Sequence, residues 1–521
     1  MTLARNLFGV LDRSARSHYA DRPAFGFEGE LVTFREMRDR SLDVAAGLSA
    51  AGVRPGDRVA VMMGNRLEWV EVLFGLAALG AVCVPVNVLL TGPEIDHMCR
   101  DSEARFMIAD EIAQAGLADI DHDFELLITV DDIDPGPRGA ERYETVRKGG
   151  AWPPPDHREP DLGDTLILYY SSGTTGLPKA AVHTHDSVLW NSFGQLPGLG
   201  LTPDVRYGVI ASFSWAAGFH NLVLALAWIG GFSQIRRTGS ASMESVTDFI
   251  VDHGITHIML VPSLLRDLVT RPDLMARLSA SPLVWVITGT EPVPRAVIEK
   301  CQAEMPGVAV CQGFGLSEFP TITTVLRPEE VAAHEGSAGR AMPHADTAVR
   351  DADGEIRFSG RGELLLRSPA SMKGYHNRPE QTAEAFRDGW LHTGDLVELD
   401  EDGYITVVGR TKDMIISGGL NVYPQEIEDL VVRLPGVTEV AVVGVPHERF
   451  GETPVAVVVT SDPDFDPASV AAACEGRLAS YKRPRWTLVR SEPLPRNANA
   501  KVLKREIRPW AATQLSIAIE D

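Results

Sequence analysis

The chain has 521 residues, which is long enough for a large core and for more than one domain. Apolar residues make up 44% of it and charged residues 23%, the balance of an ordinary globular protein. Asp and Glu outnumber Lys and Arg by 71 to 49, and the resulting net charge of −22 argues against general binding of nucleic acids.

The N-terminal stretch is charged where a signal peptide needs an apolar core. The longest apolar run, 72–86, is too short to span a bilayer and contains two Gly and one Pro. It therefore predicts a buried helix that leads into a strand, not a membrane span. The five cysteines are scattered and form no CxxC pair, which favours a reducing cytoplasm.

Short runs of branched apolar residues alternate with helical patterns along the chain. This alternation predicts a large N-terminal α/β domain with layered mixed sheets. A Pro-rich linker at 152–160 precedes an unusual glycine loop. The predicted strands of this domain are 58–62, 106–108, 166–170, 207–210, 257–260 and 284–287.

A second, self-contained pattern follows residue 410. Pro424 opens a helical segment in which apolar residues recur at i, i+3, i+4 and i+7 from Ile427. Strands are predicted at 440–445 and 455–460, so this part is expected to be a small α+β domain. The expected domains are 1–409 and 410–521.

A basic segment stands out in the acidic chain. Between Arg477 and Arg508 there are ten Lys or Arg and only two Glu. The negative charge of the whole chain does not forbid a local basic site, so this segment is either an anion site or a charged face of the small domain.

The glycine loop lies between the predicted strands 166–170 and 180–183. Glycines let backbone N–H groups approach an anion, hydroxyls add donors, and Lys179 adds a positive charge. The loop does not have the GxxxxGKS/T order of the common nucleotide-binding fold. The residues expected to hold phosphate are Ser171, Ser172, Gly173, Thr174, Thr175, Gly176 and Lys179.

The string from Tyr170 to Ala180 closely resembles the Y/F-TSGTTGxPKG loop of the adenylate-forming superfamily. That superfamily includes acyl-CoA synthetases, firefly-type luciferases and peptide-synthetase adenylation domains. Ser171 replaces a Thr and Ala180 a Gly. Further segments resemble the family in its own order, over about residues 10–510. The resemblance implies the adenylate-forming fold, with ATP, Mg²⁺ and coenzyme A as ligands.

The resemblance also implies how ATP is held. Phe314 would pack on adenine, Ser317 would meet the α-phosphate, and Glu318 would hold Mg²⁺ together with Thr174. A carboxylate oxygen suits a hard cation that bridges phosphates. The other residues implied near the nucleotide are Gly289, Thr290, Glu291, Pro292, Gln312, Gly313 and Gly315.

Residues 390–395 and 409–424 resemble two later family segments. Asp395 would accept both ribose hydroxyls, as carboxylates do in other nucleotide folds, and Arg410 would contact the nucleotide. Lys412 would be the hinge of a mobile C-terminal domain. Gly418 and Gly419 would let the backbone pass close to the pantetheine arm of coenzyme A. Its phosphates would meet Arg449 and Lys482.

Residues 494–505 resemble the family's LPRTxxGKxxKxxL segment, which places Lys501 at the catalytic lysine. Its ammonium would bridge the acid's carboxylate and the α-phosphate as charge develops. No general base is needed, because the attacking carboxylate is already ionised near pH 7. Ala500 replaces the usual Gly, which would strain the loop if that position needs a positive φ.

The acid is expected to be neutral and apolar, of medium size or ring-containing. Gly313 leaves room at the base of the implied acyl pocket. Trp215 stands where acyl-CoA synthetases often carry a His, and Gly218 and Phe219 follow it. Trp215 is assigned to this pocket. It is either a gate that limits the depth of the pocket or a core residue, which is the commoner role of a Trp.

Three alternatives stay open. One is an acid:AMP ligase that stops at acyl-AMP or hands the acyl group to a separate carrier protein. The second is a luciferase-like oxygenase, which the absence of a C-terminal SKL disfavours. The third is a non-catalytic nucleotide-binding scaffold, which the presence of Lys501, Glu318 and Asp395 disfavours. A homodimer is an expectation from the resemblance alone.

Overall fold

The structure is a computed structural model that describes residues 4–117, 120–131, 140–171, 178–239, 241–289, 293, 295–496 and 502–520. The chain divides into two compact units. The first comprises Met1–Thr347 and Leu366–Leu391, and the second comprises Ala348–Leu365 and His392–Asp521. This division reflects which residues pack together. The boundary expected after residue 409 is that of a hinge, which the division does not test, so it stays a prediction.

An eight-stranded mixed sheet in the first unit carries the strands on either side of the glycine loop. Its order is β20-β9-β8-β4-β3-β5-β6-β7. Strands β8, β4, β3 and β5 run parallel, and β9 returns antiparallel to β8. The strands are β3 (Arg58–Met62), β4 (Val82–Pro85), β5 (Phe106–Ala109), β6 (Leu126–Thr129), β7 (Glu141–Arg142), β8 (Thr165–Ser171), β9 (Lys179–Thr184) and β20 (Gly374–Tyr375).

A second run of strands in this unit has the order β16-β15-β14-β13-β12-β10-β11-β1-β2. Its middle, β13-β12-β10-β11, is parallel, and β14 and β15 form an antiparallel hairpin. The strands are β1 (Pro23–Phe27), β2 (Glu30–Thr33), β10 (Arg206–Val209), β11 (Phe232–Ile235), β12 (His257–Met259), β13 (Trp285–Thr288), β14 (Ala309–Leu316), β15 (Phe319–Leu326) and β16 (Ser337–Ala341).

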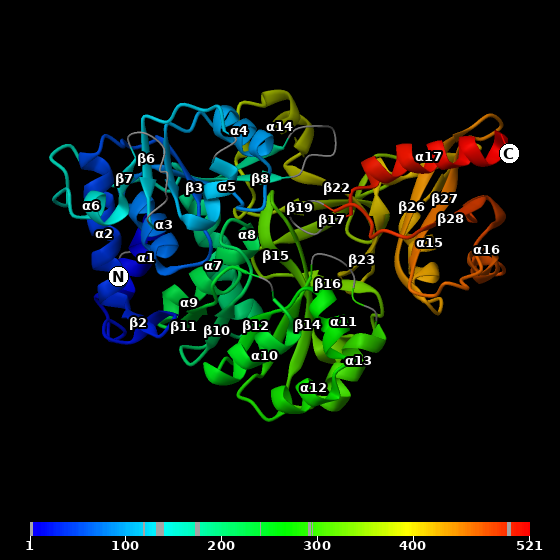
Figure 1. Cartoon of the computed structure of the whole chain (residues 1–521), viewed down its shortest axis with the longest axis horizontal. Helices are drawn as coiled ribbons and strands as arrows, with labels where there is room; N and C mark the ends of the chain where they lie inside the picture. Colours follow the sequence, from blue (N-terminus) through cyan, green and yellow to red (C-terminus); the bar gives the residue numbers. More distant parts are fainter. Residues whose placement is uncertain are drawn as a thin grey trace. The chain divides into compact units, whose positions relative to one another are not determined.

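Helices cover these sheets, and α10, α12 and α13 lie together beside β12 and β14 in Figure 1. The apolar run 72–86 forms the end of the almost wholly buried α3 and then β4, as predicted. The helices are α1 (Leu7–Ala15), α2 (Phe34–Ala50), α3 (Leu67–Leu79), α4 (Gly92–Asp101), α5 (Gln114–Leu117), α6 (Tyr143–Arg147), α7 (His185–Leu199), α8 (Ala216–Phe219), α9 (Val223–Ile229), α10 (Met243–Asp252), α11 (Pro262–Leu268), α12 (Pro272–Ser279), α13 (Arg295–Glu304) and α14 (Pro379–Ala385).

The second unit contains most of a sheet of order β18-β17-β19-β22-β23, and a five-stranded sheet of order β25-β24-β27-β26 with β28 beside β27. Helix α15 starts at Pro424 and buries Ile427 and Val431, as its periodicity predicts. The elements are β17 (Asp346–Arg350), β18 (Ile356–Arg357), β19 (Gly360–Arg367), β22 (Trp390–Leu399), β23 (Tyr404–Arg410), β24 (Ile415–Ser417), β25 (Leu420–Val422), α15 (Pro424–Val431), β26 (Val437–His447), β27 (Gly451–Thr460), α16 (Ala468–Cys474), β28 (Trp486–Arg490) and α17 (Lys504–Glu520). The short strand β21 (Phe386–Arg387) belongs to the first unit.

The described part of the chain contains no helix with the length and apolarity needed to cross a bilayer. The predicted α/β architecture, with a small α+β portion at the C-terminal end, is confirmed by these elements.

Candidate functional site

A phenol joins the end of the glycine loop to the predicted metal ligand. The hydroxyl of Tyr375 donates to Oε1 of Glu318 at 2.8 Å. The Nζ atom of Lys179, the last residue of the loop motif, lies 4.2 Å from the centre of the Tyr375 ring. Strands β9 and β20 bring these groups together, because Tyr375 pairs with Ala181 in the ladder. A cation and a carboxylate, both suited to MgATP, therefore lie at one place in the first unit.

The backbone around Ser317 and Glu318 is held from two sides. Nε2 of the buried His183 lies 2.8 Å from the carbonyl oxygen of Ser317. The N–H of Met372 donates to the carbonyl oxygen of Glu318 at 2.8 Å. Burial lowers the pKa of His183 to about 4, so this imidazole is neutral at physiological pH and can donate from Nε2. These bonds fix the turn between β14 and β15.

Gly289, one of the residues implied near adenine, is packed closely against β14. Gly289 is buried, and a Cβ on it would lie 2.5 Å from the carbonyl oxygen of Gly313. Phe314 is half-buried on β14. The amide of Gln312 is used inside the protein, because it accepts from the N–H of Val293 and donates to the carbonyl of Ser337. Its side chain therefore braces this segment.

The residues expected at the acyl pocket differ in burial. Trp215 is half-buried, and its indole Nε1 has no hydrogen-bond partner among the described residues. Phe219 is fully buried, and the centre of its ring lies 4.1 Å from that of Phe213 and 5.2 Å from that of Trp69. Gly218 is needed for packing, because a Cβ there would lie 2.1 Å from the carbonyl oxygen of Ser212.

In the second unit, Asp395 and Arg410 are partners. They sit opposite each other on β22 and β23, and Nε of Arg410 lies 2.8 Å from Oδ1 of Asp395. The Asp395 side chain is 4% exposed and that of Arg410 is 32% exposed. Asp395, predicted to bind the ribose, and Arg410, predicted to contact the nucleotide, thus form one charged pair, with the guanidinium reaching solvent.

The glycine pair of the second unit forms the turn between β24 and β25. Gly418 and Gly419 have φ values of +61° and +81°, which favour glycine. A Cβ on Gly419 would meet nothing within 4 Å, so open space adjoins this backbone. The N–H of Gly418 donates to the carbonyl of Phe450 at 2.8 Å. The guanidinium carbons of Arg449 and Arg485 lie 5.3 and 4.3 Å from the centre of the Phe450 ring.

Much of the basic segment is paired with carboxylates. Lys482, which was expected to meet coenzyme A, forms an ion pair with Glu426. Lys504 lies 2.6 Å from Glu428. Further ion pairs join Arg483 to Glu475, Arg490 to Glu492, Arg496 to Glu439 and Arg508 to Glu452. Much of its positive charge therefore stabilises the second unit, while Arg485 and nearby Arg449 remain exposed.

Several predicted residues lie outside the described part of the structure. Lys412 is described and its side chain is exposed, whereas the backbone of Ser171 is described in β8 but not its side chain. The residues outside the described ranges are Ser172, Gly173, Thr174, Thr175, Gly176, Thr290, Glu291, Pro292, Ala500 and Lys501.

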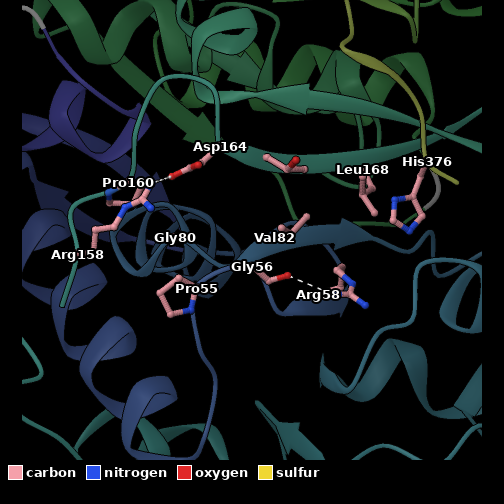
Figure 2. Close-up of a pocket in the computed structure, with 11 residues that line it drawn as sticks. Pro55, Gly56, Arg58, Gly80, Val82, Arg158, Pro160, Asp164, Leu168 and His376 are labelled. Carbon is pink, nitrogen blue, oxygen red and sulfur yellow. Dashed lines mark hydrogen bonds and ion pairs between the residues drawn. The ribbon is translucent and has the colours of Figure 1, made fainter. Parts of the chain in front are cut away.

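A surface pocket of about 410 Å³ lies in the first unit (Figure 2). Gly56, Arg58, Gly80, Val82 and Thr165 line it at the amino ends of β3, β4 and β8. The glycine loop follows the carboxyl end of β8, which is the opposite edge of the sheet. Leu168 on β8 and His376, the residue after Tyr375, also line the pocket.

Tyr375 is the site residue that sequence reasoning missed. It is 57 positions from Glu318 and belongs to a two-residue strand, which has no periodicity to recognise. The one local signal is Gly374 before it, since a glycine inside a strand pattern often marks a close backbone approach.

The sequence matches the family model described as AMP-binding enzyme over residues 11–376. It also matches the model described as AMP-binding enzyme C-terminal domain over residues 426–501. The chain belongs to the AMP-binding enzyme family. The predicted membership of the adenylate-forming superfamily is thereby confirmed.

Relatives of this AMP-binding enzyme are CoA ligases. It is 37% identical over 482 residues to the long-chain-fatty-acid–CoA ligase FadD13 of Mycobacterium tuberculosis, covering 92% of both chains. It is 35% identical over 486 residues to the feruloyl-CoA synthase of an Amycolatopsis species, covering 92% of this chain and 94% of that one.

A solved structure of o-succinylbenzoate coenzyme A synthetase (MenE) from Bacillus subtilis, in complex with ATP and magnesium ion, is similar with a TM-score of 0.82. The identity is 27%, over 95% of this chain and 98% of that one. The fold and the predicted class, an acyl-CoA ligase among AMP-binding enzymes, are confirmed by these similarities.

Proposed function

We propose that this AMP-binding enzyme activates a carboxylic acid in two half-reactions on residues of its own chain. In the first, the acid and ATP give acyl-AMP and pyrophosphate. In the second, acyl-AMP and coenzyme A give acyl-CoA and AMP. The observation that carries the proposal is the meeting of Lys179, Tyr375 and Glu318 beside the glycine loop, which suits a metal-bound triphosphate.

In the first half-reaction, an oxygen of the ionised carboxylate attacks the α-phosphate in line, and pyrophosphate leaves. The loop from Ser171 to Lys179 would hold the phosphates. Glu318 offers Oε2, which has no partner among the described residues, as the kind of hard oxygen ligand that Mg²⁺ takes. When bound, Mg²⁺ would neutralise charge on the phosphate oxygens. Lys501 would align the carboxylate and the α-phosphate.

In the second half-reaction, the thiol of coenzyme A attacks the acyl carbon and AMP leaves. We propose that rotation about Lys412 withdraws Lys501 and brings the Gly418–Gly419 turn to the acyl-AMP. The open space beside Gly419 supports this, because a slender pantetheine arm can lie against bare backbone. The exposed Arg449 and Arg485, stacked on Phe450, are the better candidates for its phosphates, since Lys482 is already paired.

The acid is proposed to be neutral, apolar and of medium size or ring-containing. The bulky, half-buried Trp215, which stands between the buried Phe213 and Phe219 in the sequence, supports an apolar lining. Delivery of the acyl group to a separate carrier protein is the second candidate acceptor. A homodimer stays a prediction.

A cytoplasmic location is also proposed. The five cysteines are all free and buried. Burial raises the pKa of the Cys301 thiol to about 11 and that of Cys99 to about 12, so both are protonated and poorly reactive at pH 7. Buried, unpaired thiols are typical of proteins kept in a reducing compartment.

The test separates the half-reactions with Lys501→Ala. The variant should lose acid-dependent pyrophosphate release by about 100-fold or more, as when one electrostatic transition-state contact is removed. It should still make thioester from supplied acyl-AMP and coenzyme A. Unchanged pyrophosphate release would refute the assigned role of Lys501 and show that Ala500 marks a displaced loop.

A further inference from the structure

Tyr375 is anchored more firmly than a surface tyrosine. It belongs to β20, and its backbone N–H donates to Oγ1 of Thr382 at 2.9 Å. The N–H of His376 donates to the carbonyl oxygen of Ala180, one residue beyond Lys179, at 2.9 Å. Gly374 has a φ of +152°, and a Cβ on it would lie 2.6 Å from Cγ2 of Thr382. The backbone that carries the ring is therefore tied to β9 and α14.

The phenol is suited to act as a permanent hydrogen-bond donor. Burial, followed by the charge of Glu318 and the bond to it, raises the pKa of Tyr375 well above its usual value of 10. The hydroxyl therefore keeps its proton at physiological pH and can donate to Glu318. A bond from a neutral donor to an ionised carboxylate is stronger than one between neutral groups. The Tyr375 hydroxyl bonds to Oε1 of the Glu318 carboxylate and does not bond to Oε2.

The ring of the same side chain contacts the loop cation. An ammonium 4.2 Å from the ring centre lies within the range in which the negative face of the ring attracts it. Lys179 and Glu318 carry opposite charges, and Tyr375 touches both. It can therefore hold the cation for phosphate and the carboxylate for a metal ion with a fixed spacing.

We propose that Tyr375 is a positioning residue that orients Glu318 for Mg²⁺ and Lys179 for the phosphates of ATP. The proposal rests on the proposed function, because it assigns Tyr375 to the same nucleotide site. Groups that hydrogen-bond to a metal-binding side chain typically change metal affinity about 10–100-fold when removed. Tyr375 would act through Glu318 and Lys179, without touching the reacting atoms.

The decisive variant is Tyr375→Phe, which removes the hydroxyl but keeps the ring over Lys179. Calorimetric titration with ATP measures its affinity for the protein, once in excess Mg²⁺ and once in EDTA. No acid is added, so ATP is not turned over. The wild-type chain should bind ATP more tightly with Mg²⁺. In Tyr375→Phe this gain should shrink about tenfold, while binding in EDTA stays unchanged. Tyr375→Leu, which also removes the ring, should weaken binding in EDTA as well.

The matched control is Tyr143→Phe. Tyr143 on α6 also donates to a glutamate, Glu71, at 2.8 Å. Helix α6 follows β7, which is at the opposite end of the sheet from β8 and β9. This variant should bind ATP with and without Mg²⁺ as the wild type does. The proposal is overturned if Mg²⁺ increases the ATP affinity of Tyr375→Phe as much as that of the wild type. It is also overturned if Tyr143→Phe loses the same part of this increase, or if the wild type shows no increase.

Two further measurements keep the outcome decisive. If Tyr375→Phe does not fold, Thr382→Val, which removes the acceptor of the Tyr375 N–H, should reduce the Mg²⁺ gain about threefold, and no reduction overturns the proposal. The concentration of Mg²⁺ that half-saturates pyrophosphate release should rise about tenfold in Tyr375→Phe. A wild-type chain that binds MgATP but adenylates no acid would refute the proposed function, while the calorimetric comparison would still decide the role of Tyr375.

Discussion

Asp395→Asn removes the negative charge from the ion pair that Asp395 forms with Arg410 on β22 and β23. It leaves the guanidinium of Arg410 without its carboxylate partner. Losing one partner of a fully buried pair costs about 3–5 kcal/mol. Because the Arg410 side chain is 32% exposed, water can solvate it, and the expected loss in free energy of unfolding falls to about 1–2 kcal/mol. Since an Asn is also a poorer acceptor for two ribose hydroxyls, ATP affinity should fall about tenfold or more.

Denaturant unfolding and calorimetric titration with ATP measure the two effects. The matched control is Asp248→Asn, which breaks an exposed pair with Arg277 at 2.7 Å, with side chains 52% and 43% exposed. It should change the free energy of unfolding by less than about 0.5 kcal/mol and leave ATP binding unchanged. If the two variants unfold alike and bind ATP alike, the assignment of Asp395 and Arg410 to the nucleotide site is wrong.

Two further predictions concern packing and pH. Gly218→Ala should cost about 1–3 kcal/mol, because its Cβ would lie 2.1 Å from the backbone of Ser212. Gly163→Ala, where a Cβ meets nothing within 4 Å, should cost less than about 0.5 kcal/mol, and equal losses in thermal unfolding would contradict the packing argument. Burial lowers the pKa of His183 to about 4, so between pH 6.5 and 4 the unfolded chain binds a proton that the folded chain does not. The free energy of unfolding should therefore fall as the pH falls through this window. In denaturation curves, His183→Gln should reduce this dependence on pH by at most about 1.4 kcal/mol per pH unit. An unchanged dependence would show that His183 does not contribute.

Local patterns predicted the elements well. The strand 58–62 is β3, and the helix opened by Pro424 is α15. These segments have a strong period and clear end signals, so their structure depends mainly on near neighbours.

The site could be predicted only where the family motif carried it. The bond between Tyr375 and Glu318 depends on β20 pairing with β9, which nothing in two residues of sequence indicates. The basic segment was expected to bind anions, yet Lys482 and Lys504 are paired with Glu426 and Glu428 of α15. Such pairs join residues more than 50 positions apart, so charge counting along the sequence does not reveal them.

The structure also separates two residues that the sequence assigned to the acyl pocket together. Trp215 and Phe219 are four positions apart, yet Trp215 is half-buried, whereas Phe219 is fully buried against the rings of Phe213 and Trp69. Which of two neighbouring aromatic residues faces a substrate depends on the turn of α8 against the core, a tertiary property. Sequence alone placed both in the same pocket.

The central claim is that one chain adenylates an acid and then transfers the acyl group to coenzyme A. The most direct measurement offers the purified chain MgATP and a panel of aliphatic and aromatic acids, and follows pyrophosphate and thioester separately with and without coenzyme A. The account predicts that acids which release pyrophosphate also yield acyl-CoA, one for one, once coenzyme A is added. Pyrophosphate without any acyl-CoA would contradict the second half-reaction and favour a separate carrier protein as acceptor.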